Sequence, residues 1–341
     1  TQNFTSATDS NNTAVGYNAG SLITTGTNNT AIGKDALLAN TTGAGNTAVG
    51  MRALTANTTA SNNNSFGKDS LYANTTGAQN NAFGLSALQN NTSGADNTAV
   101  GHVALFANTT GGQNTAIGRN ALDANTTASN NTAVGYNALT TSTTGADNVA
   151  VGKDAMAATT TGGFNTAVGV DSLTTNTTGQ SNVAFGVNAL LSNETGSNNV
   201  ALGQQALQAN TTADFNTAVG YQAGIANTTG ASMVAVGSFA LDANTTGDAN
   251  VAVGQNAIST NTTGSNNTAL GHRALRDSTT ASNNTAVGFD ALKVNTTGAE
   301  VTAVGANALD EATTAVQLAA LGNGALGGVT TGNGNSEFGW K

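Results

Sequence analysis

The stretch Asn46-Thr47-Ala48-Val49-Gly50, followed by Ala53-Leu54 and Asn57-Thr58-Thr59, decides the fold. Its pattern returns every 17 residues, and a glycine marks each return without exception from Gly16 to Gly339. A constant period without insertions is typical of a solenoid, in which each repeat contacts mainly its two neighbours. We therefore expect 20 coils of 17 residues that form one continuous solenoid over residues 1–341, without a separate capping domain.

The composition agrees with an ordered stack and excludes several classes of function. The chain contains no proline and no cysteine, and only 8% of its residues are charged. Because proline lacks an amide hydrogen, its absence fits a backbone that is hydrogen-bonded from coil to coil. Without cysteine there is neither a disulfide framework nor a thiolate metal site. A net charge of -9 without a basic stripe argues against nucleic acid as a partner. The sequence contains no run of 18 apolar residues, so no membrane span is predicted in this segment.

Alternation in the first part of the repeat predicts a short strand. Thr47 and Val49 fall on one face, and Asn46, Ala48 and Gly50 fall on the other. Valine replaces the threonine in several copies, so we expect the face that carries Thr47 and Val49 to be at least half buried.

The second part of the repeat opens with Asn, Asp or Ser and continues with Ala-Leu, as at Asn120-Ala121-Leu122. This order indicates an N-cap followed by helix formers. The fold class is therefore predicted as all-β: a parallel β-solenoid, or β-roll, with one short strand plus a short helical or second-strand segment per coil.

The predicted core is slim, with two large apolar side chains per coil, such as Val134 and Leu139. An alanine column that includes Ala48 and Ala116 suggests a way to add burial, because small residues let the backbone of another chain approach closely. We accordingly favour a homo-oligomer, a trimer or a filament. In the alternative interpretation, these alanines simply fit a narrow interior.

Three kinds of residue are expected to form structural ladders along the stack. The glycines end the strand and turn the chain, the asparagines form side-chain amide ladders, and the threonines satisfy turn amides. Representative ladder positions are Gly16, Gly33, Gly50, Gly118, Gly152, Asn46, Asn97, Asn114, Asn131, Thr58 and Thr126.

The variable residue after each glycine is the candidate for recognition. This column mixes aromatic and basic side chains and predicts a rib that binds a receptor, a glycan or a neighbouring fibre. The alternative is neutral variation on an exposed turn. The candidate rib comprises Tyr17, Lys34, His102, Arg119, Tyr136, Lys153, Tyr221 and Phe289.

No catalytic, cofactor or metal site is predicted. The histidines His102 and His272 lie ten coils apart, too far to share a site within one chain, and the acidic residues scatter over several columns. The Gly-Gly-x-Gly-x-Asp pattern of calcium-binding rolls is missing. We therefore expect a non-enzymatic protein without a cofactor.

Paired threonine columns, such as Thr58-Thr59, offer an alternative function. Regular hydroxyl arrays occur on ice-binding solenoids, so the Thr and Asn ladders predict an ice- or polysaccharide-binding module as a second hypothesis. Adjacent residues point to opposite faces, however, so only one threonine rank is expected to face outward. The simpler interpretation is that the hydroxyls satisfy turn amides.

Copies such as Asn199-Val200-Ala201-Leu202-Gly203 resemble the Val-Ala-Ile-Gly head repeats of trimeric autotransporter adhesins. The longer form, from Asn131 to Leu139, resembles repeat shafts of secreted bacterial proteins and phage tail fibres. This resemblance covers the whole chain. It implies a parallel β-roll, usually trimeric and left-handed, that serves as a shaft or adhesive head at a cell or virion surface. A host-surface or glycan ligand would be its partner, beside further copies of itself.

Overall fold

The computed structural model describes residues 11–340, which belong to two compact units divided between Ala167 and Val168. Unit 1 contains strands β1 (Thr13–Val15), β2 (Thr30–Ile32), β3 (Thr47–Val49), β4 (Asn64–Phe66), β5 (Asn81–Phe83), β6 (Thr98–Val100), β7 (Thr115–Ile117), β8 (Thr132–Val134) and β9 (Val149–Val151). Strand β10 (Thr166–Val168) falls at the division. Unit 2 contains β11 (Val183–Phe185), β12 (Val200–Leu202), β13 (Thr217–Val219), β14 (Val234–Val236), β15 (Val251–Val253), β16 (Thr268–Leu270), β17 (Thr285–Val287), β18 (Thr302–Val304), β19 (Ala319–Leu321) and β20 (Ser336–Phe338).

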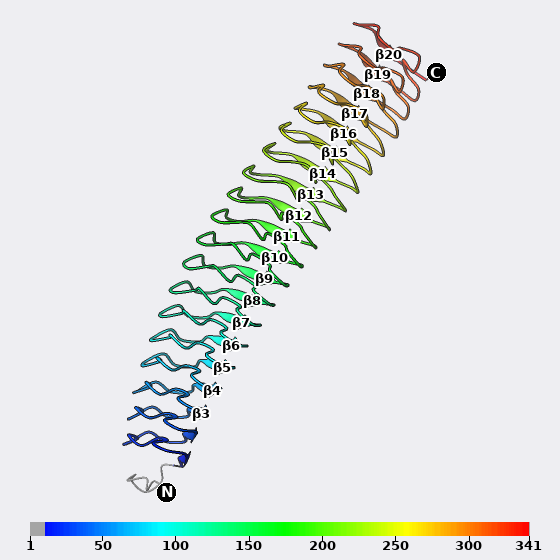
Figure 1. Ribbon diagram of the computed structural model, residues 1–341. Coiled ribbons are helices and arrows are strands. Elements are labelled where there is room, and N and C mark those ends of the chain that lie inside the picture. The colour runs from blue at the N-terminus through cyan, green and yellow to red at the C-terminus, as the bar shows by residue number, and fades with distance from the viewer. Residues whose placement is uncertain (1–10, 341) are drawn as a thin grey trace. The chain divides into compact units, whose positions relative to one another are not determined.

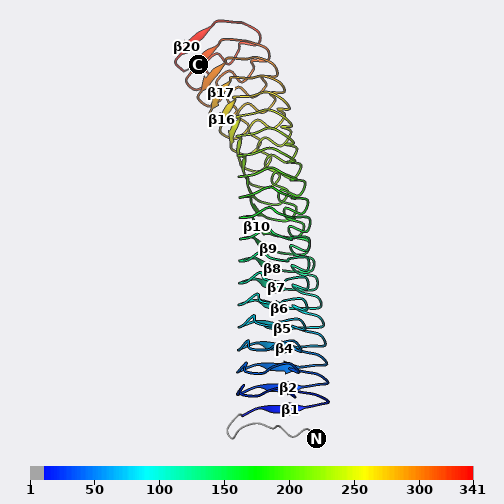
Figure 2. The same ribbon diagram turned by 90° about the vertical axis from the view of Figure 1, so that its left-hand side faces the viewer.

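Within each unit, successive strands pair in parallel with a register of 17 residues. In unit 1 Thr30 pairs with Thr47, and in unit 2 Val183 pairs with Val200. Each coil contributes one strand to the ladder, and the rest of the coil runs as turns (Figures 1 and 2). The predicted all-β parallel solenoid with a 17-residue repeat is therefore confirmed.

The helical option for the second segment is wrong, because residues 11–340 contain no helix. They also contain no second strand in each coil, since only one strand recurs per repeat. In place of either element, alternate residues adopt left-handed backbone conformations: φ is 58° at Asn120 and 51° at Leu122. Asn, Asp and Ser head the segment because they tolerate positive φ, and they do not act there as helix N-caps.

The left-handed residues let the turn bond to both neighbouring coils. The amide of Asn120 donates to the carbonyl of His102 in the preceding coil at 3.2 Å. Two residues later, the amide of Leu122 donates to the carbonyl of Ala138 in the following coil at 3.1 Å. Turn and strand thus belong to one continuous set of coil-to-coil hydrogen bonds.

The repeat glycine is required by both conformation and space. Gly118 and Gly152 have φ values of 135° and 138°, a region that side-chain-bearing residues avoid. A Cβ built on Gly118 would lie 2.3 Å from the carbonyl oxygen of Gly135 in the next coil. The same approach recurs for Gly16, Gly33 and Gly50, each of which faces the next repeat glycine. The glycine column therefore sets how closely the coils stack at the end of the strand.

The interior of each coil contains the Ala-Leu pair and the central alanine of the strand. Leu139, Ala133 and Ala138 are completely buried, whereas Val134 points outward and is only partly covered. The expectation that Val134 fills the core is wrong, because the narrow coil admits the small Ala133 and turns the larger valine out. The alanine column is buried within a single chain, so it gives another chain no surface to approach. The narrow-interior interpretation accounts for these alanines.

Two columns of buried asparagines share one carbonyl acceptor in most coils. The side-chain amides of Asn46 and Asn57 both donate to the carbonyl oxygen of Ala60 at 2.9 Å. Asn57 also donates to the side-chain oxygen of Asn40 in the preceding coil at 2.8 Å. The oxygen of Asn46 accepts the backbone amide of Asn63 in the following coil at 3.0 Å.

The same geometry holds further along unit 1. The amides of Asn114 and Asn125 converge on the carbonyl of Ala128 at 2.9 and 3.1 Å. The amide of Asn97 bonds to the carbonyl of Gly111, and that of Asn131 to the carbonyl of Gly145, each at 2.9 Å. The side chains of these asparagines fill part of the interior and are hydrogen-bonded there. A chain with few large apolar residues can therefore still form an ordered core.

Candidate functional site

The surface most suited to recognition is the outer strand face, which we define as three outward ranks. The first and third residues of each strand and the residue after the repeat glycine point away from the coil interior, as in Thr30, Ile32 and Lys34. Coil-to-coil stacking covers the sides of these residues and leaves their ends exposed. The second rank of unit 1, formed by the third residue of each strand, has exposed fractions of 39% at Ile32 and 40% at Ile117.

In unit 2 the outer strand face is largely apolar, and in the coil of β11 all three ranks are apolar. Val183, Phe185 and Val187 are exposed to 40%, 51% and 43%, and in the next coil Val200 and Leu202 are exposed as well. These residues are adjacent because Val183 pairs with Val200 and Phe185 with Leu202. The face remains free of charge from β11 to β15. From β12 to β15, the residues that follow the repeat glycine are Gln, Tyr or Ser.

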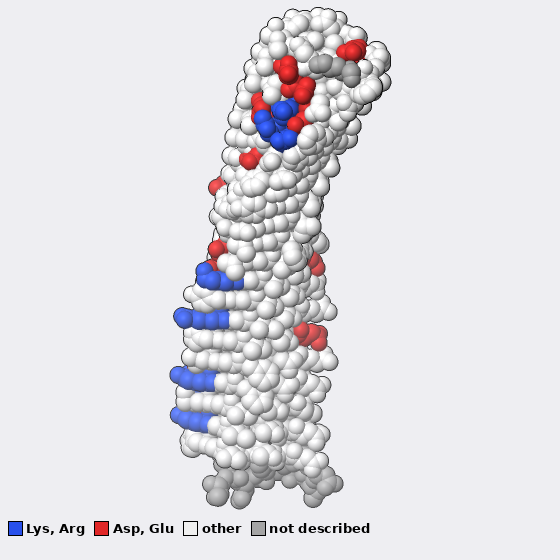
Figure 3. Space-filling model, turned by 90° about the vertical axis from the view of Figure 1, so that its right-hand side faces the viewer, with Lys and Arg blue, Asp and Glu red and all other residues white. Residues whose placement is uncertain are grey.

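Six of the predicted rib residues share one rank in unit 1. Tyr17 is 69% exposed and Tyr136 is 45% exposed, and the basic members are also exposed. The rank in unit 1 comprises the predicted Tyr17, Lys34, His102, Arg119, Tyr136 and Lys153, together with Met51, Lys68 and Leu85. In the space-filling view, basic side chains project in a row along one margin, and acidic side chains lie both beside this row and on the opposite margin (Figure 3).

The two rib residues of unit 2 have different surroundings. The ring of Tyr221 meets that of Phe239 edge to face, with centroids 5.3 Å apart. Phe289 stacks on His272 at 5.6 Å and lies under the guanidinium of Arg273 at 5.2 Å. Tyr221 and Phe289 therefore belong to local clusters and do not extend the alternating basic rank of unit 1.

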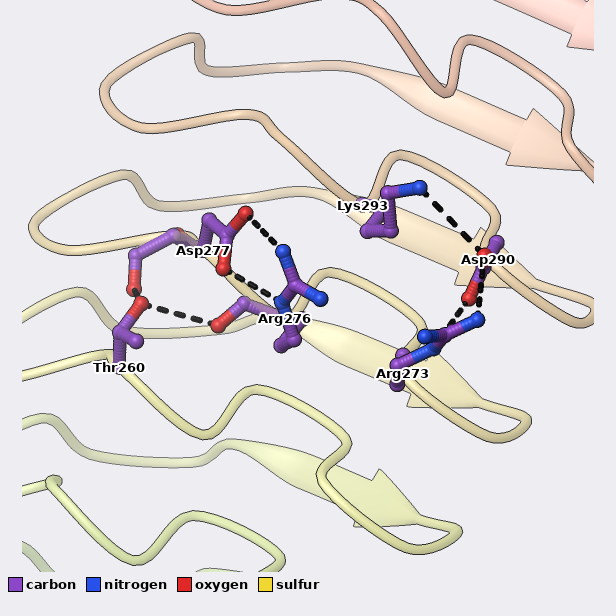
Figure 4. A network of polar contacts seen from close by, with 7 residues as sticks. Thr260, Arg273, Arg276, Asp277, Asp290 and Lys293 are labelled. Atoms are coloured by element: carbon purple, nitrogen blue, oxygen red, sulfur yellow. Dashed lines mark hydrogen bonds and ion pairs between the residues drawn. The ribbon is translucent and has the colours of Figure 1, made fainter.

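A charged network in unit 2 was not predicted from the sequence. Arg273 donates two hydrogen bonds of 2.8 Å to the nearly buried carboxylate of Asp290, and Lys293 lies 3.4 Å from the same carboxylate (Figure 4). Arg276 pairs with its neighbour Asp277 at 2.6 Å. The sequence contains a signal for this pairing, because Arg273 and Asp290 carry opposite charges and lie one repeat period apart. Arg52 and Asp69 form an equivalent ion pair between adjacent coils of unit 1, with a hydrogen bond of 2.9 Å.

The two threonine ranks have different roles. The hydroxyl of Thr58 donates to the carbonyl of Thr75 at 3.3 Å, and that of Thr126 to the carbonyl of Thr143 at 3.2 Å. The following residues, such as Thr59 and Thr127, are exposed. The hydroxyls of one threonine rank therefore donate to carbonyl oxygens of the next coil, and not to turn amides as predicted, while the other rank faces solvent. The asparagine columns are buried and give an external ligand no contact.

Asp242 is the carboxylate whose environment perturbs it most among those described. It is half-buried, and its Oδ1 atom has no hydrogen-bond partner within residues 11–340. Burial raises the pKa of Asp242 to about 6, against the smaller opposing effect of hydrogen bonds from the amides of Asp242 and Ala243. A carboxyl whose pKa is higher in the folded than in the unfolded chain lowers stability as the pH rises through that range.

Acidification from about pH 7 to about pH 5 is therefore expected to increase the stability of unit 2 through Asp242. Substitution Asp242→Asn should raise the melting temperature at pH 7.5 and reduce its rise on acidification, because the amide carries no charge to desolvate. The matched control is Asp248→Asn, which neutralises an exposed carboxylate six residues later that accepts a hydrogen bond from the amide of Ala231. Melting followed by circular dichroism at pH 5 and 7.5 measures the difference. Equal pH responses of wild type and Asp242→Asn would show that Asp242 does not titrate in this range.

Comparison with known protein families and with curated protein sequences gives no match to this chain. Within residues 11–340, no three His, Cys, Asp or Glu side chains gather closely enough to hold a metal ion. No helix able to cross a membrane occurs in the same part of the chain. His102 and His272 belong to different units, one on an exposed rank and the other stacked on Phe289.

Proposed function

We propose that this chain is a non-enzymatic structural protein, an extracellular fibre, shaft or adhesin head that self-assembles as a trimer or filament at a cell or virion surface. The observation that carries the proposal is the apolar outer strand face of unit 2. Exposed Val, Phe and Leu side chains repeat there in adjacent coils, and contiguous exposed apolar surface marks interaction sites on soluble proteins.

A second copy of the chain is the partner that this face fits. Its apolar side chains recur once per coil, at about the 4.8 Å spacing of neighbouring strands. Another solenoid with the same period matches that spacing over many coils, whereas an irregular protein surface matches it only locally. The face has no charge to desolvate between Val183 and Leu270, so its burial carries no ionic cost. Self-association is therefore proposed on the apolar face of unit 2 and not on the alanine column, which is buried within one chain.

A structural role also fits the arrangement of the polar side chains. Asn46, Asn57 and their equivalents bond to the coils beside them, and charged residues such as Arg52 and Asp69 pair across neighbouring coils. Catalysis would require acid, base or nucleophile to converge around a bound substrate. Here the chemistry-bearing residues are spread in ranks, which supports recognition by repetition.

The double substitution Phe185→Ser/Leu202→Ser is expected to weaken self-association, because it removes two exposed apolar side chains from adjacent strands. Light scattering should give wild-type masses at a multiple of 33.3 kDa and a shift towards 33.3 kDa for the variant. The matched control is Gln204→Ser/Gln255→Ser, which changes two exposed polar residues on the same face. A wild-type chain that is monomeric at all concentrations would contradict the proposal.

The alternative function, an ice- or polysaccharide-binding solenoid, retains one exposed threonine rank as support. That rank includes Thr42, Thr59 and Thr76, which repeat in successive coils of unit 1. Thermal hysteresis of the purified chain separates this alternative from a passive shaft, since only a surface that adsorbs to ice lowers the freezing point without lowering the melting point.

A further inference from the structure

The Lys and Arg residues of unit 1 gather on one margin of the outer strand face. Lys34, Lys68, Arg119 and Lys153 all follow a repeat glycine directly, and the remaining cation, Arg52, is one residue further along its coil. The acidic residues Asp96 and Asp147 lie in a different column, before the strand. Three other carboxylates of unit 1, Asp35, Asp69 and Asp154, directly follow Lys34, Lys68 and Lys153 in the chain.

Apolar and aromatic residues alternate with the cations along this rank. From coil to coil the order is Tyr17, Lys34, Met51, Lys68, Leu85, His102, Arg119, Tyr136 and Lys153, which we call the basic rib. With neighbouring strands about 4.8 Å apart, cations two coils apart are separated by about 9.6 Å. The Tyr, Met and Leu members are exposed between them, with Tyr17 at 69%.

Two cations of the basic rib lack an ion-pair partner within residues 11–340, and the two paired ones keep more than half of their side-chain surface exposed. Lys34 and Arg119 form no ion pair within residues 11–340. Lys153 lies 2.6 Å from Asp154 and Lys68 lies 3.9 Å from Asp69, yet their side chains are 59% and 53% exposed. Covering this rib with the apolar face of another copy would strip water from several cations, so the rib is poorly suited to the self-association proposed for unit 2.

The spacing of the cations selects among polyanions. DNA presents one charge per about 1.7 Å of helix axis, far denser than Lys and Arg side chains that lie two or three coils apart. An extended polysaccharide that carries carboxylates on its sugars has a lower charge density, and one sugar residue is about as long as one coil rise. Tyrosine supplies a flat apolar ring with a polar tip, which suits the mixed surface of a sugar.

We propose that the basic rib of unit 1 binds a linear acidic polysaccharide, a polyuronate, that lies along the solenoid. Lys34, Lys68, Arg119 and Lys153 pair with sugar carboxylates, and Tyr17, Met51, Leu85 and Tyr136 contact the sugar faces between them. The inference rests on the proposed extracellular role only for its setting, because such polymers are cell-surface and matrix components. It involves unit 1 and is independent of the apolar face of unit 2.

The experiment measures binding of polygalacturonate to the full chain by isothermal titration calorimetry at several salt concentrations. Fully methyl-esterified polygalacturonate serves as the uncharged probe with the same backbone. Wild type should bind the charged polymer and lose affinity as salt increases, since released counterions drive such binding. The variant Lys34→Gln/Arg119→Gln should bind at least about tenfold more weakly with a shallower salt dependence.

The matched control is Arg276→Gln/Lys293→Gln, which removes two cations from unit 2 and should leave the affinity unchanged. Tyr17→Ala/Tyr136→Ala should weaken binding without altering its salt dependence, because it removes contacts and no charge. Equal affinities of wild type and Lys34→Gln/Arg119→Gln would overturn the proposal. Equal binding of the esterified polymer, or equal binding of double-stranded DNA, would overturn it as well.

Light scattering separates this inference from the proposed assembly. A monomeric chain that binds polygalacturonate through Lys34 and Arg119 would contradict self-assembly and support the basic rib. A chain that forms oligomers but does not bind the polymer would contradict the rib and leave the shaft in place. If Lys34→Gln/Arg119→Gln changes the oligomeric mass and not polymer binding, the rib contacts a second copy and the polysaccharide proposal is wrong.

Discussion

Substitution Gly118→Ala is expected to destabilise its coil by about 3 kcal/mol, the upper end of the cost of holding a side-chain-bearing residue in a glycine-only conformation. The backbone at Gly118 has φ = 135°, and a Cβ there would lie 2.3 Å from the carbonyl oxygen of Gly135. Relief would require the two coils to separate at the end of the strand. That separation would weaken the hydrogen bond from the amide of Gly135 to Ile117, which is 2.8 Å long.

The matched control is Gly111→Ala in the preceding turn. A Cβ on Gly111 would also approach a carbonyl, that of Ala128 at 2.2 Å, but its φ does not lie in the left-handed region. Moreover, alanine already occupies the equivalent position at Ala60 and Ala128. Gly111→Ala should therefore cost less than about 1 kcal/mol.

Hydrogen exchange is the appropriate measurement for both glycine variants, because a long repeat array need not unfold in a two-state manner. Amides of β7 and β8 should exchange faster in Gly118→Ala, while amides several coils away keep their wild-type rates. If Gly118→Ala and Gly111→Ala show the same protection, the positive φ and close approach do not govern coil stacking.

Substitution Asn125→Asp is expected to cost about 3–5 kcal/mol, the range for leaving a buried charge without a partner. Asn125 is completely buried, and its amide donates to Asn108 Oδ1 at 2.8 Å and to the carbonyl of Ala128 at 3.1 Å. A carboxylate has no hydrogen to donate, so it would face two acceptor oxygens. Because burial raises the pKa of a carboxyl group, part of the lost stability should return as the pH falls.

The chain provides its own control for Asn125. Serine occupies the same column at Ser142 and Ser278, where it is also buried. Asn125→Ser removes one of the side-chain bonds without introducing charge, so it should cost only about 1–2 kcal/mol. Thermal melting at pH 7.5 and pH 4.5 compares the two variants. A loss in Asn125→Asp that does not depend on pH would indicate that the effect arises from shape and not from charge.

The sequence predicted the period, the strand and the amide columns because each is a one-dimensional pattern. It did not predict which strand face points inward, since Ala48 and Val49 are both apolar and alternation alone gives no direction. The width of the coil determines which strand face points inward, and this width depends on the conformation of the turns. The conformation of Leu122 was not predictable for a related reason. Leucine after alanine is typical of a helix, whereas Leu122 has a left-handed φ of 51°, which is uncommon for a bulky residue.

The surface was predictable in part. Residues after the repeat glycine had to be accessible, because the glycine turns the chain there, and Tyr136 and Lys153 are indeed exposed. The pairing of Arg273 with Asp290 depends on the side chains of adjacent coils meeting, which the 17-residue spacing permits and does not require. The apolar character of the unit 2 face could be recognised only after the strand orientation was known.

The convergence of two asparagine amides on one carbonyl has a consequence for how such a protein can change over time. Most coils offer their successor the same donors and acceptors at the same heights, as Asn46, Asn57 and Ala60 do for the coil that follows them. Any two coils that carry both asparagines are thus acceptable neighbours. Recombination between repeats in the gene can lengthen or shorten the protein by whole coils without creating a mismatched joint, whereas gain or loss of a single residue breaks every column at once.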